Sequence, residues 1–148
     1  MSDNRISPRE AHAKILEGYA YVDVRTEQEF EQGHPEGAMN VPILLAGPGG
    51  MTPNPEFTKV MAGSFKPNSK IIVGCKAGGR SLKAAATLVK EGYTDVLDQR
   101  AGWDGARDAF GQLTEPGWSR AGLPVEVGAP SGRSYGELKR RASESEAG

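Results

Sequence analysis

The fold is decided by the stretch Ile71-Ile-Val-Gly-Cys75-Lys76-Ala77-Gly78-Gly79-Arg80-Ser81. Its apolar beginning predicts a buried strand over residues 70–74. After the glycines, apolar residues recur at helical spacing, which predicts a helix that starts at Ser81 and ends near Gly92. The apolar face expected for this helix consists of Leu82, Ala85, Ala86 and Val89. A strand that passes through a short loop into a helix is typical of an α/β protein.

The rest of the chain repeats this alternation of short strands and short helices. Capping boxes at Ser7 and Thr26 predict helices over residues 8–16 and 26–32, and Asn54 precedes a helix with Phe57, Val60 and Met61 on one face. Short strands are expected at residues 21–24, 39–41, 70–74 and 96–97. The pattern therefore predicts an α/β fold with a mostly parallel sheet.

The remaining segments include one predicted helix and several stretches without regular secondary structure. Residues 45–55 are rich in proline and glycine and predict a loop. Residues 102–110 predict a helix, and residues 111–122 look irregular before the domain closes at 123–125. We therefore expect one domain over residues 5–128, followed by a polar tail over 129–148 that buries little and is mobile.

Composition restricts the classes of function. The chain has 148 residues and a net charge of −1, so it gives no long-range attraction to nucleic acid or acidic membranes. Its single cysteine excludes an internal disulfide, and His12 and His34 do not form a zinc-ligand pattern, so no metal and no cofactor are expected. The N-terminus lacks an apolar signal segment. We expect a cytoplasmic protein in a reducing compartment.

The residues around Cys75 predict a reactive thiol. Gly78 and Gly79 permit positive φ, so successive amides between Lys76 and Ser81 can turn toward the sulfur and form an anion-binding nest. The following helix terminus and the cations Lys76 and Arg80 favour the thiolate and attract an anionic substrate. A lone cysteine is more often a buried apolar residue. Two glycines and two cations lie within five positions of the thiol, and such residues do not suit a hydrophobic core. They therefore favour a catalytic role for Cys75.

This loop resembles the active-site loop of rhodanese-family sulfurtransferases. The segment from Tyr21 to Arg25, the pair Glu29-Phe30 and the run from Gly33 to Pro42 are similar to the family's first signature. Residues 122–126 resemble its closing segment, and the likeness covers residues 5–128. Pro35 and the insertion over residues 112–119 depart from the pattern. The resemblance is strongest to compact single-domain thiosulfate sulfurtransferases, and it implies a parallel sheet with helices on both faces.

The resemblance also implies a mechanism and a set of site residues. Cys75 attacks the outer sulfur of thiosulfate, a small anionic donor, releases sulfite and holds the sulfur as a persulfide. A thiophilic acceptor then removes it, either cyanide or, in a cell, a thiol or a partner protein. The expected substrate-binding residues are Lys76, Ala77, Gly78, Gly79, Arg80 and Ser81. Asp23 and Arg25 are expected to pair and to support the site, and His34 is expected to be structural.

Two other functions stay open. A phosphatase or arsenate reductase of the same fold also uses a cysteine followed by an arginine, but its loop is one residue longer than the four residues between Cys75 and Arg80. A binding or redox-sensing module without catalysis is the second alternative. The tail and the 45–55 loop suit such a module, but modules of that kind often lack the cysteine that this chain keeps.

Overall fold

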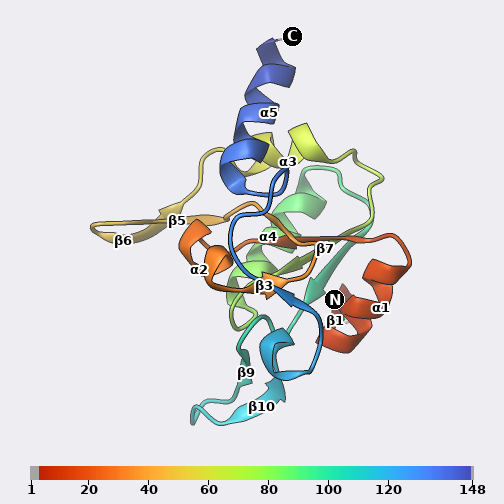
Figure 1. Cartoon of the computed structure of the whole chain (residues 1–148), viewed down its shortest axis with the longest axis vertical. Coiled ribbons are helices and arrows are strands. Elements are labelled where there is room, and N and C mark those ends of the chain that lie inside the picture. The colour runs from red at the N-terminus through yellow and green to blue at the C-terminus, as the bar shows by residue number, and fades with distance from the viewer. Residues whose placement is uncertain (1–3, 148) are drawn as a thin grey trace.

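The computed structural model describes residues 4–147, and its centre is a five-stranded sheet in the order β1-β8-β7-β2-β4 (Figure 1). All four pairings in this sheet are parallel. Its strands are β1 (Arg5–Ile6), β2 (Ala20–Asp23), β4 (Met39–Asn40), β7 (Ile71–Gly74) and β8 (Val96–Gln99). Residues 1–3 and Gly148 lie outside the described residues. The expectation that the N-terminus lacks a signal segment falls partly on residues 1–3, and the predicted tail includes Gly148.

The helices and the smaller strand pairs surround this sheet. The helices are α1 (Pro8–Leu16), α2 (Glu27–Gln32), α3 (Phe57–Ser64), α4 (Gly79–Lys90), α5 (Tyr135–Ala147) and the 3-10 helix η2 (Trp118–Arg120). The remaining strands are β3 (His34–Pro35), β5 (Leu44–Gly47), β6 (Gly50–Pro53), β9 (Gly105–Arg107), β10 (Leu113–Pro116) and β11 (Val125–Glu126). Within residues 4–147, no helix is long and apolar enough to cross a membrane.

Both predicted capping boxes are confirmed. The Ser7 side chain accepts from the Glu10 amide, and the Glu10 carboxylate accepts from the Ser7 amide, so α1 begins at Pro8 as expected. Thr26 and Glu29 make the same reciprocal pair at the start of α2. These two helices are specified by hydrogen bonds within four residues, which is why their starts can be predicted from sequence.

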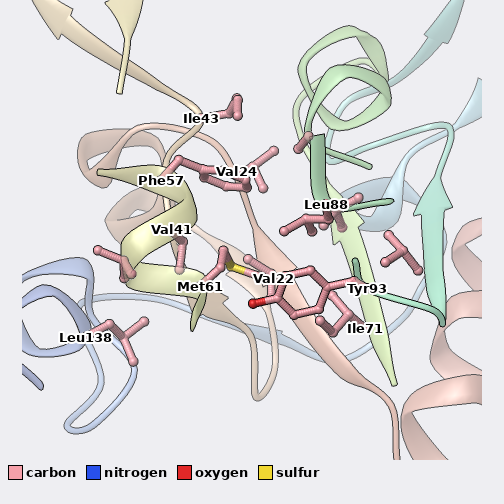
Figure 2. Close-up of a cluster of buried hydrophobic side chains, with 14 of the residues drawn as sticks. Val22, Val24, Val41, Ile43, Phe57, Met61, Ile71, Leu88, Tyr93 and Leu138 are labelled. Atoms are coloured by element: carbon pink, nitrogen blue, oxygen red, sulfur yellow. The ribbon is translucent and has the colours of Figure 1, made fainter. Parts of the chain in front are cut away.

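The two faces of the sheet bury separate clusters, as the predicted α/β architecture with helices on both faces requires. One cluster combines Val22, Val73 and Cys75 with side chains of α3, α4 and α5. Figure 2 shows Met61 of α3 and Leu88 of α4 in this cluster. The other cluster combines alternate strand residues, including Tyr21 and Ile72, with side chains of α1 and α2. The sheet is therefore the middle layer of three.

The predicted loop over residues 45–55 is wrong, because this segment forms a hairpin. Strands β5 and β6 pair antiparallel with Leu44 opposite Pro53 and Gly47 opposite Gly50, so Pro48 and Gly49 form the turn. The residues of β6 are exposed, and an exposed strand lacks the alternating apolar pattern that sequence analysis relies on. Figure 1 shows this hairpin extending away from the body of the protein.

The predicted helix over residues 102–110 is also wrong. Gly102 has a φ of +66°, and the chain after it turns into β9, which pairs with β10 as a second hairpin. The amides of Trp103 and Asp104 donate to the carbonyls of Cys75 and Lys76 at 2.7 and 2.9 Å. These long-range bonds to the Cys75 loop replace the local bonds that a helix would need.

Helix α4 is present, but its buried face is not the predicted one. It starts at Gly79, two residues earlier than expected, and buries Ser81, Ala84 and Leu88. Leu82 and Val89, which were expected to face the core, are 51% and 53% exposed. The loop that carries Cys75 fixes the helix so that Ser81 faces the sulfur, and this sets the orientation of every later turn.

The expectation that the tail buries little is wrong for residues 135–142. This segment is the first part of α5, which packs beside α3 (Figure 1). Tyr135, Leu138 and Ala142 are 5%, 0% and 4% exposed and belong to the main core cluster. Figure 2 shows Leu138 on the same side of the sheet as Met61. These three apolar residues on one helix face attach α5 to the core, although the segment is otherwise polar.

Candidate active site

Cys75 lies directly after β7 and four residues before Gly79, the first residue of α4. Its side chain is 3% exposed and belongs to the core cluster on the α4 side of the sheet. The strand–loop–helix arrangement predicted around this thiol is therefore present. The sulfur is sheltered by the loop and does not project into solvent.

Two groups contact the sulfur directly. The amide of Gly78 donates to Cys75 Sγ at 3.1 Å, and Cys75 Sγ lies 3.5 Å from Ser81 Oγ, to which the thiol donates. Because a hydroxyl can rotate, Ser81 can donate to the sulfur once the thiol is ionised. Among the described residues, Gly78 is the backbone donor seen on the sulfur, so the expected nest of several amides is reduced to one amide and one hydroxyl.

Gly78 is the residue that turns the loop inward. Its φ is +102°, and a Cβ at this position would lie 2.4 Å from the Arg100 carbonyl oxygen. The Gly78 carbonyl accepts from Arg5 Nη2 at 3.2 Å, which holds the outside of the loop. Gly79, which was also expected to use positive φ, instead has helical backbone in α4. One glycine therefore makes the turn.

The segment over residues 101–104 packs against the backbone of the Cys75 loop. A Cβ at Gly102 would lie 2.6 Å from the Cys75 carbonyl oxygen, so the close approach of the two backbones requires glycine at this position. Gln99, which is fully buried, accepts from the amides of Ala101 and Gly102 at 2.8 Å and donates to the Gly102 carbonyl at 2.9 Å. Gln99 could not be identified from the sequence, because a single glutamine at the end of a strand carries no recognisable signal.

The cations of the loop are paired with carboxylates. Arg80 donates to both oxygens of Glu29, at 2.7 and 2.9 Å, and Lys76 Nζ lies 3.8 Å from Asp104 Oδ2. From the sequence, Lys76 and Arg80 were expected to be available for substrate, and Glu29 was not assigned to the site. The capping box at Thr26 identified Glu29 as part of α2, but it gave no sign of a partner 51 positions away.

These contacts keep the Glu29–Arg80 pair ionised. Burial raises the pKa of Glu29, but the hydrogen bonds from Arg80 and Thr26 outweigh it and hold that pKa at about 2. The hydrogen bond to Glu29 raises the pKa of Arg80, and the electrostatic interaction with nearby Cys75 contributes in the same direction. The guanidinium is thus a fixed positive charge close to the sulfur.

Asp23 and Arg25 form the predicted ion pair. Arg25 Nη2 lies 2.7 Å from Asp23 Oδ2, and the two side chains are 4% and 2% exposed. Arg25 also donates to the Gly33 carbonyl at 2.6 Å and lies 5.1 Å from the centre of the Trp103 ring. Asp23 thus holds Arg25 in place, and Arg25 is the member of the pair that reaches the site.

A cavity of about 230 Å³ opens beside the loop. Its lining residues are Arg25, Glu29, Gln32, Lys76, Trp103 and Asp104. Since Trp103 and Asp104 are bonded to the Cys75 and Lys76 carbonyls, the cavity is built on the loop itself. It is polar, its lining carries two cations and two carboxylates, and it can hold a small charged molecule beside the loop that carries the thiol.

His34 has a structural role, as expected. It is fully buried, its Nδ1 lies 2.6 Å from the Phe30 carbonyl and its Nε2 lies 3.0 Å from Glu126. Trp118 is likewise buried, and its indole donates to the Pro124 carbonyl. Within residues 4–147, no group of three or more histidine, cysteine or acidic residues is arranged to hold a metal ion.

Comparison with known proteins agrees with this geometry. The family described as "Rhodanese-like domain" matches residues 7–109. The chain is 40% identical over 122 residues to "Thiosulfate sulfurtransferase 16, chloroplastic" from Arabidopsis thaliana, which covers 82% of this chain and 92% of that protein. It is 30% identical over 128 residues to thiosulfate sulfurtransferase GlpE from Haemophilus influenzae (strain PittEE), covering 86% and 98%.

A solved structure shares the fold. The crystal structure of Rv0390 from M. tuberculosis matches with a TM-score of 0.70 at 27% identity, covering 84% of this chain and 97% of that one. These two relatives and this solved structure therefore match the chain over nearly their whole length, and the family match over residues 7–109 contains the strand, loop and helix that carry Cys75.

Proposed function

This chain belongs to the family of rhodanese-like domains, and we propose that it is a sulfurtransferase that carries sulfane sulfur on Cys75. One observation supports this most: the thiol sits between a strand end and a helix start, with the Gly78 amide 3.1 Å and the Ser81 hydroxyl 3.5 Å from the sulfur. Such donors stabilise a thiolate and, after transfer, a persulfide anion.

The proposed reaction has two half-steps. The Cys75 thiolate attacks the outer sulfur of thiosulfate, a bond forms between Sγ and that sulfur, and the bond to the sulfonate sulfur breaks with its electron pair leaving on sulfite. The acceptor then attacks the outer sulfur of the Cys75 persulfide, and the thiolate is restored. Cyanide would become thiocyanate, and a thiol would become a persulfide. This is covalent catalysis by an activated nucleophile.

The loop residues have distinct roles in this proposal. Gly78 and Ser81 hold the sulfur. Lys76 and Arg25, which line the cavity, and Arg80, which is bound to the lining residue Glu29, provide the positive charge for the donor. Ala77 and Gly79 complete the loop without a side chain that would close it. The donor is either thiosulfate or another sulfane-sulfur compound, and the acceptor is a thiol or a partner protein. A single free thiol suits a reducing compartment such as the cytoplasm.

The phosphatase alternative has less support. Both terminal nitrogens of Arg80 are engaged by Glu29, whereas a phosphatase needs its arginine fork for the phosphate. The loop between Cys75 and Arg80 has four residues, as the sequence already indicated. A binding module without catalysis would not need the contacts that surround the sulfur.

A steady-state assay separates these functions. Wild-type protein with thiosulfate and cyanide should form thiocyanate, and Cys75→Ser should form none above the uncatalysed rate. The same two proteins should hydrolyse an aryl phosphate at equal, background rates. Rapid phosphate release by wild type would instead support the phosphatase, and inactivity toward both substrates and toward organic persulfides would support the binding module.

A further inference from the structure

The cations around Cys75 are matched one for one by carboxylates. The pairs are Arg25 with Asp23 at 2.7 Å, Arg80 with Glu29 at 2.7 Å and Lys76 with Asp104 at 3.8 Å. The charges of these six side chains cancel. The site therefore differs from the strongly positive cradle that the loop sequence alone predicts, although it still holds three cations.

Glu29 is the carboxylate that is best placed to influence the donor. It lines the cavity beside the loop, whereas Asp23 is 2% exposed and lies behind Arg25. Thr26 fixes it from α2, since Glu29 Oε1 accepts from the Thr26 amide at 3.0 Å and from Thr26 Oγ1 at 3.1 Å. The Arg80 and Glu29 side chains are 16% and 24% exposed, so solvent screens this charge only in part.

We propose that Glu29 determines donor specificity, favouring organic persulfides, whose reacting –S–SH group carries at most one negative charge, over the thiosulfate dianion. This role deepens and rests on the sulfurtransferase function proposed above. A dianion that binds Arg80 must displace the Glu29 carboxylate, which accepts two hydrogen bonds from the guanidinium. The dianion must then lie beside the negative charge of Glu29. An organic persulfide needs no such displacement.

The cavity suits such a donor. Its volume of about 230 Å³ accommodates a small organic group, and Trp103 gives that group an aromatic surface. The step balances without any oxidant. The Cys75 thiolate attacks the terminal sulfur of R–S–S–H, the Sγ–S bond forms as the bond to R–S breaks, and the electron pair leaves on the thiolate R–S⁻. The proton stays on the transferred sulfur and passes to solvent when the persulfide ionises.

Glu29→Gln tests this role while keeping the local structure. Glutamine can replace glutamate in a capping box, so α2 should still form, but the negative charge is removed. Glu31→Gln is the matched control, because it neutralises an exposed carboxylate on the same helix. Single-turnover loading of Cys75 is followed by intact mass with two donors, thiosulfate and uncharged 2-hydroxyethyl hydropersulfide. The quantity compared is the ratio of the two loading rates, which does not depend on the folded fraction of a preparation.

We expect Glu29→Gln to raise the thiosulfate-to-persulfide rate ratio on the order of tenfold, mainly through thiosulfate, and Glu31→Gln to leave it within about twofold. Asp104→Asn, which releases the more exposed Lys76, should shift the ratio in the same direction but less. An unchanged ratio in Glu29→Gln would overturn the role of Glu29, even though both donors load Cys75. Failure of both donors to load wild-type Cys75 would instead overturn the sulfurtransferase function itself.

Discussion

The sulfur of Cys75 and the hydroxyl of Ser81 lie 3.5 Å apart across the first turn of α4. Ser81 is fully buried, and its hydroxyl also donates to the Gly78 carbonyl at 3.3 Å. The same side chain therefore connects the nucleophile to the residue that turns the loop. This contact explains why α4 buries Ser81 and not the apolar residue that follows it.

Ser81→Ala should slow sulfur transfer without unfolding the protein. The substitution removes one hydrogen bond to the thiolate and persulfide, worth about 1.4 kcal/mol, so kcat/KM for the thiosulfate reaction should fall about tenfold. Thr87→Ala removes a hydroxyl from the exposed side of the same helix and should leave kcat/KM unchanged. Equal activity of Ser81→Ala and wild type would show that the hydroxyl does not act on the sulfur.

Alanine at the two loop glycines should have opposite effects. Gly78→Ala places a Cβ 2.4 Å from the Arg100 carbonyl oxygen at a φ of +102°, so it should destabilise the fold by about 2 kcal/mol or more and abolish transfer. Gly79 lies in α4, and its Cβ would meet open space. Gly79→Ala should therefore stabilise the protein by about 0.5–1 kcal/mol.

Urea unfolding of both variants, together with the thiocyanate assay, provides the comparison. If Gly79→Ala proved as damaging as Gly78→Ala, the loop would need two turning glycines, as the sequence first suggested, and the geometry described above would be incorrect.

The sequence predicts those parts of the site that depend on contacts between residues close together in the chain. The strand before Cys75, the loop and the start of α2 are specified by neighbouring residues, and all were predicted. The pairing of Arg80 with Glu29 joins positions 51 apart, and the hydrogen bonds from Trp103 and Asp104 to the loop join positions 28 apart. No pattern within a single segment contains these contacts.

Helix α5 illustrates a second limit. Its composition is polar, which predicts little burial, yet Leu138 is fully buried and the Tyr135 hydroxyl accepts from Asn54 Nδ2 at 3.0 Å. Both contacts depend on where α3 and the β6–α3 connection lie in the fold. The sequence of the tail predicted neither the burial of Leu138 nor the surface that receives it.

Leu138→Ala should destabilise the whole domain, because it removes a fully buried side chain from the main core cluster. The expected loss is about 2–5 kcal/mol in the free energy of unfolding, measured by urea denaturation. Ser143→Ala, on the exposed side of α5, should cost less than about 0.5 kcal/mol. A Leu138→Ala variant as stable as wild type would mean that α5 does not contribute to the core.

Acid should weaken the fold partly through Glu29. The folded-state pKa of Glu29 is held at about 2, below its usual value of 4.5, so its contribution is complete above pH 4.5 and is lost as the pH falls toward 2. After allowance for solvent screening of this partly exposed pair, the contribution is about 1–2 kcal/mol.

Unfolding free energies of wild type and Glu29→Gln, measured at several pH values, should therefore differ by that amount at pH 7 and converge near pH 2. A deficit in Glu29→Gln that is the same at every pH would indicate that the substitution acts through packing and not through the lost charge.

The most direct test of sulfur transfer to Cys75 is the intact mass of the protein after brief exposure to thiosulfate and removal of excess donor. Because Cys75 is the only cysteine, we predict one added sulfur atom per chain, release of one sulfite, and return to the original mass on addition of cyanide. Cys75→Ser should gain nothing. An unchanged wild-type mass with no sulfite released, or an equal gain in Cys75→Ser, would contradict the proposal that Cys75 takes sulfur from thiosulfate.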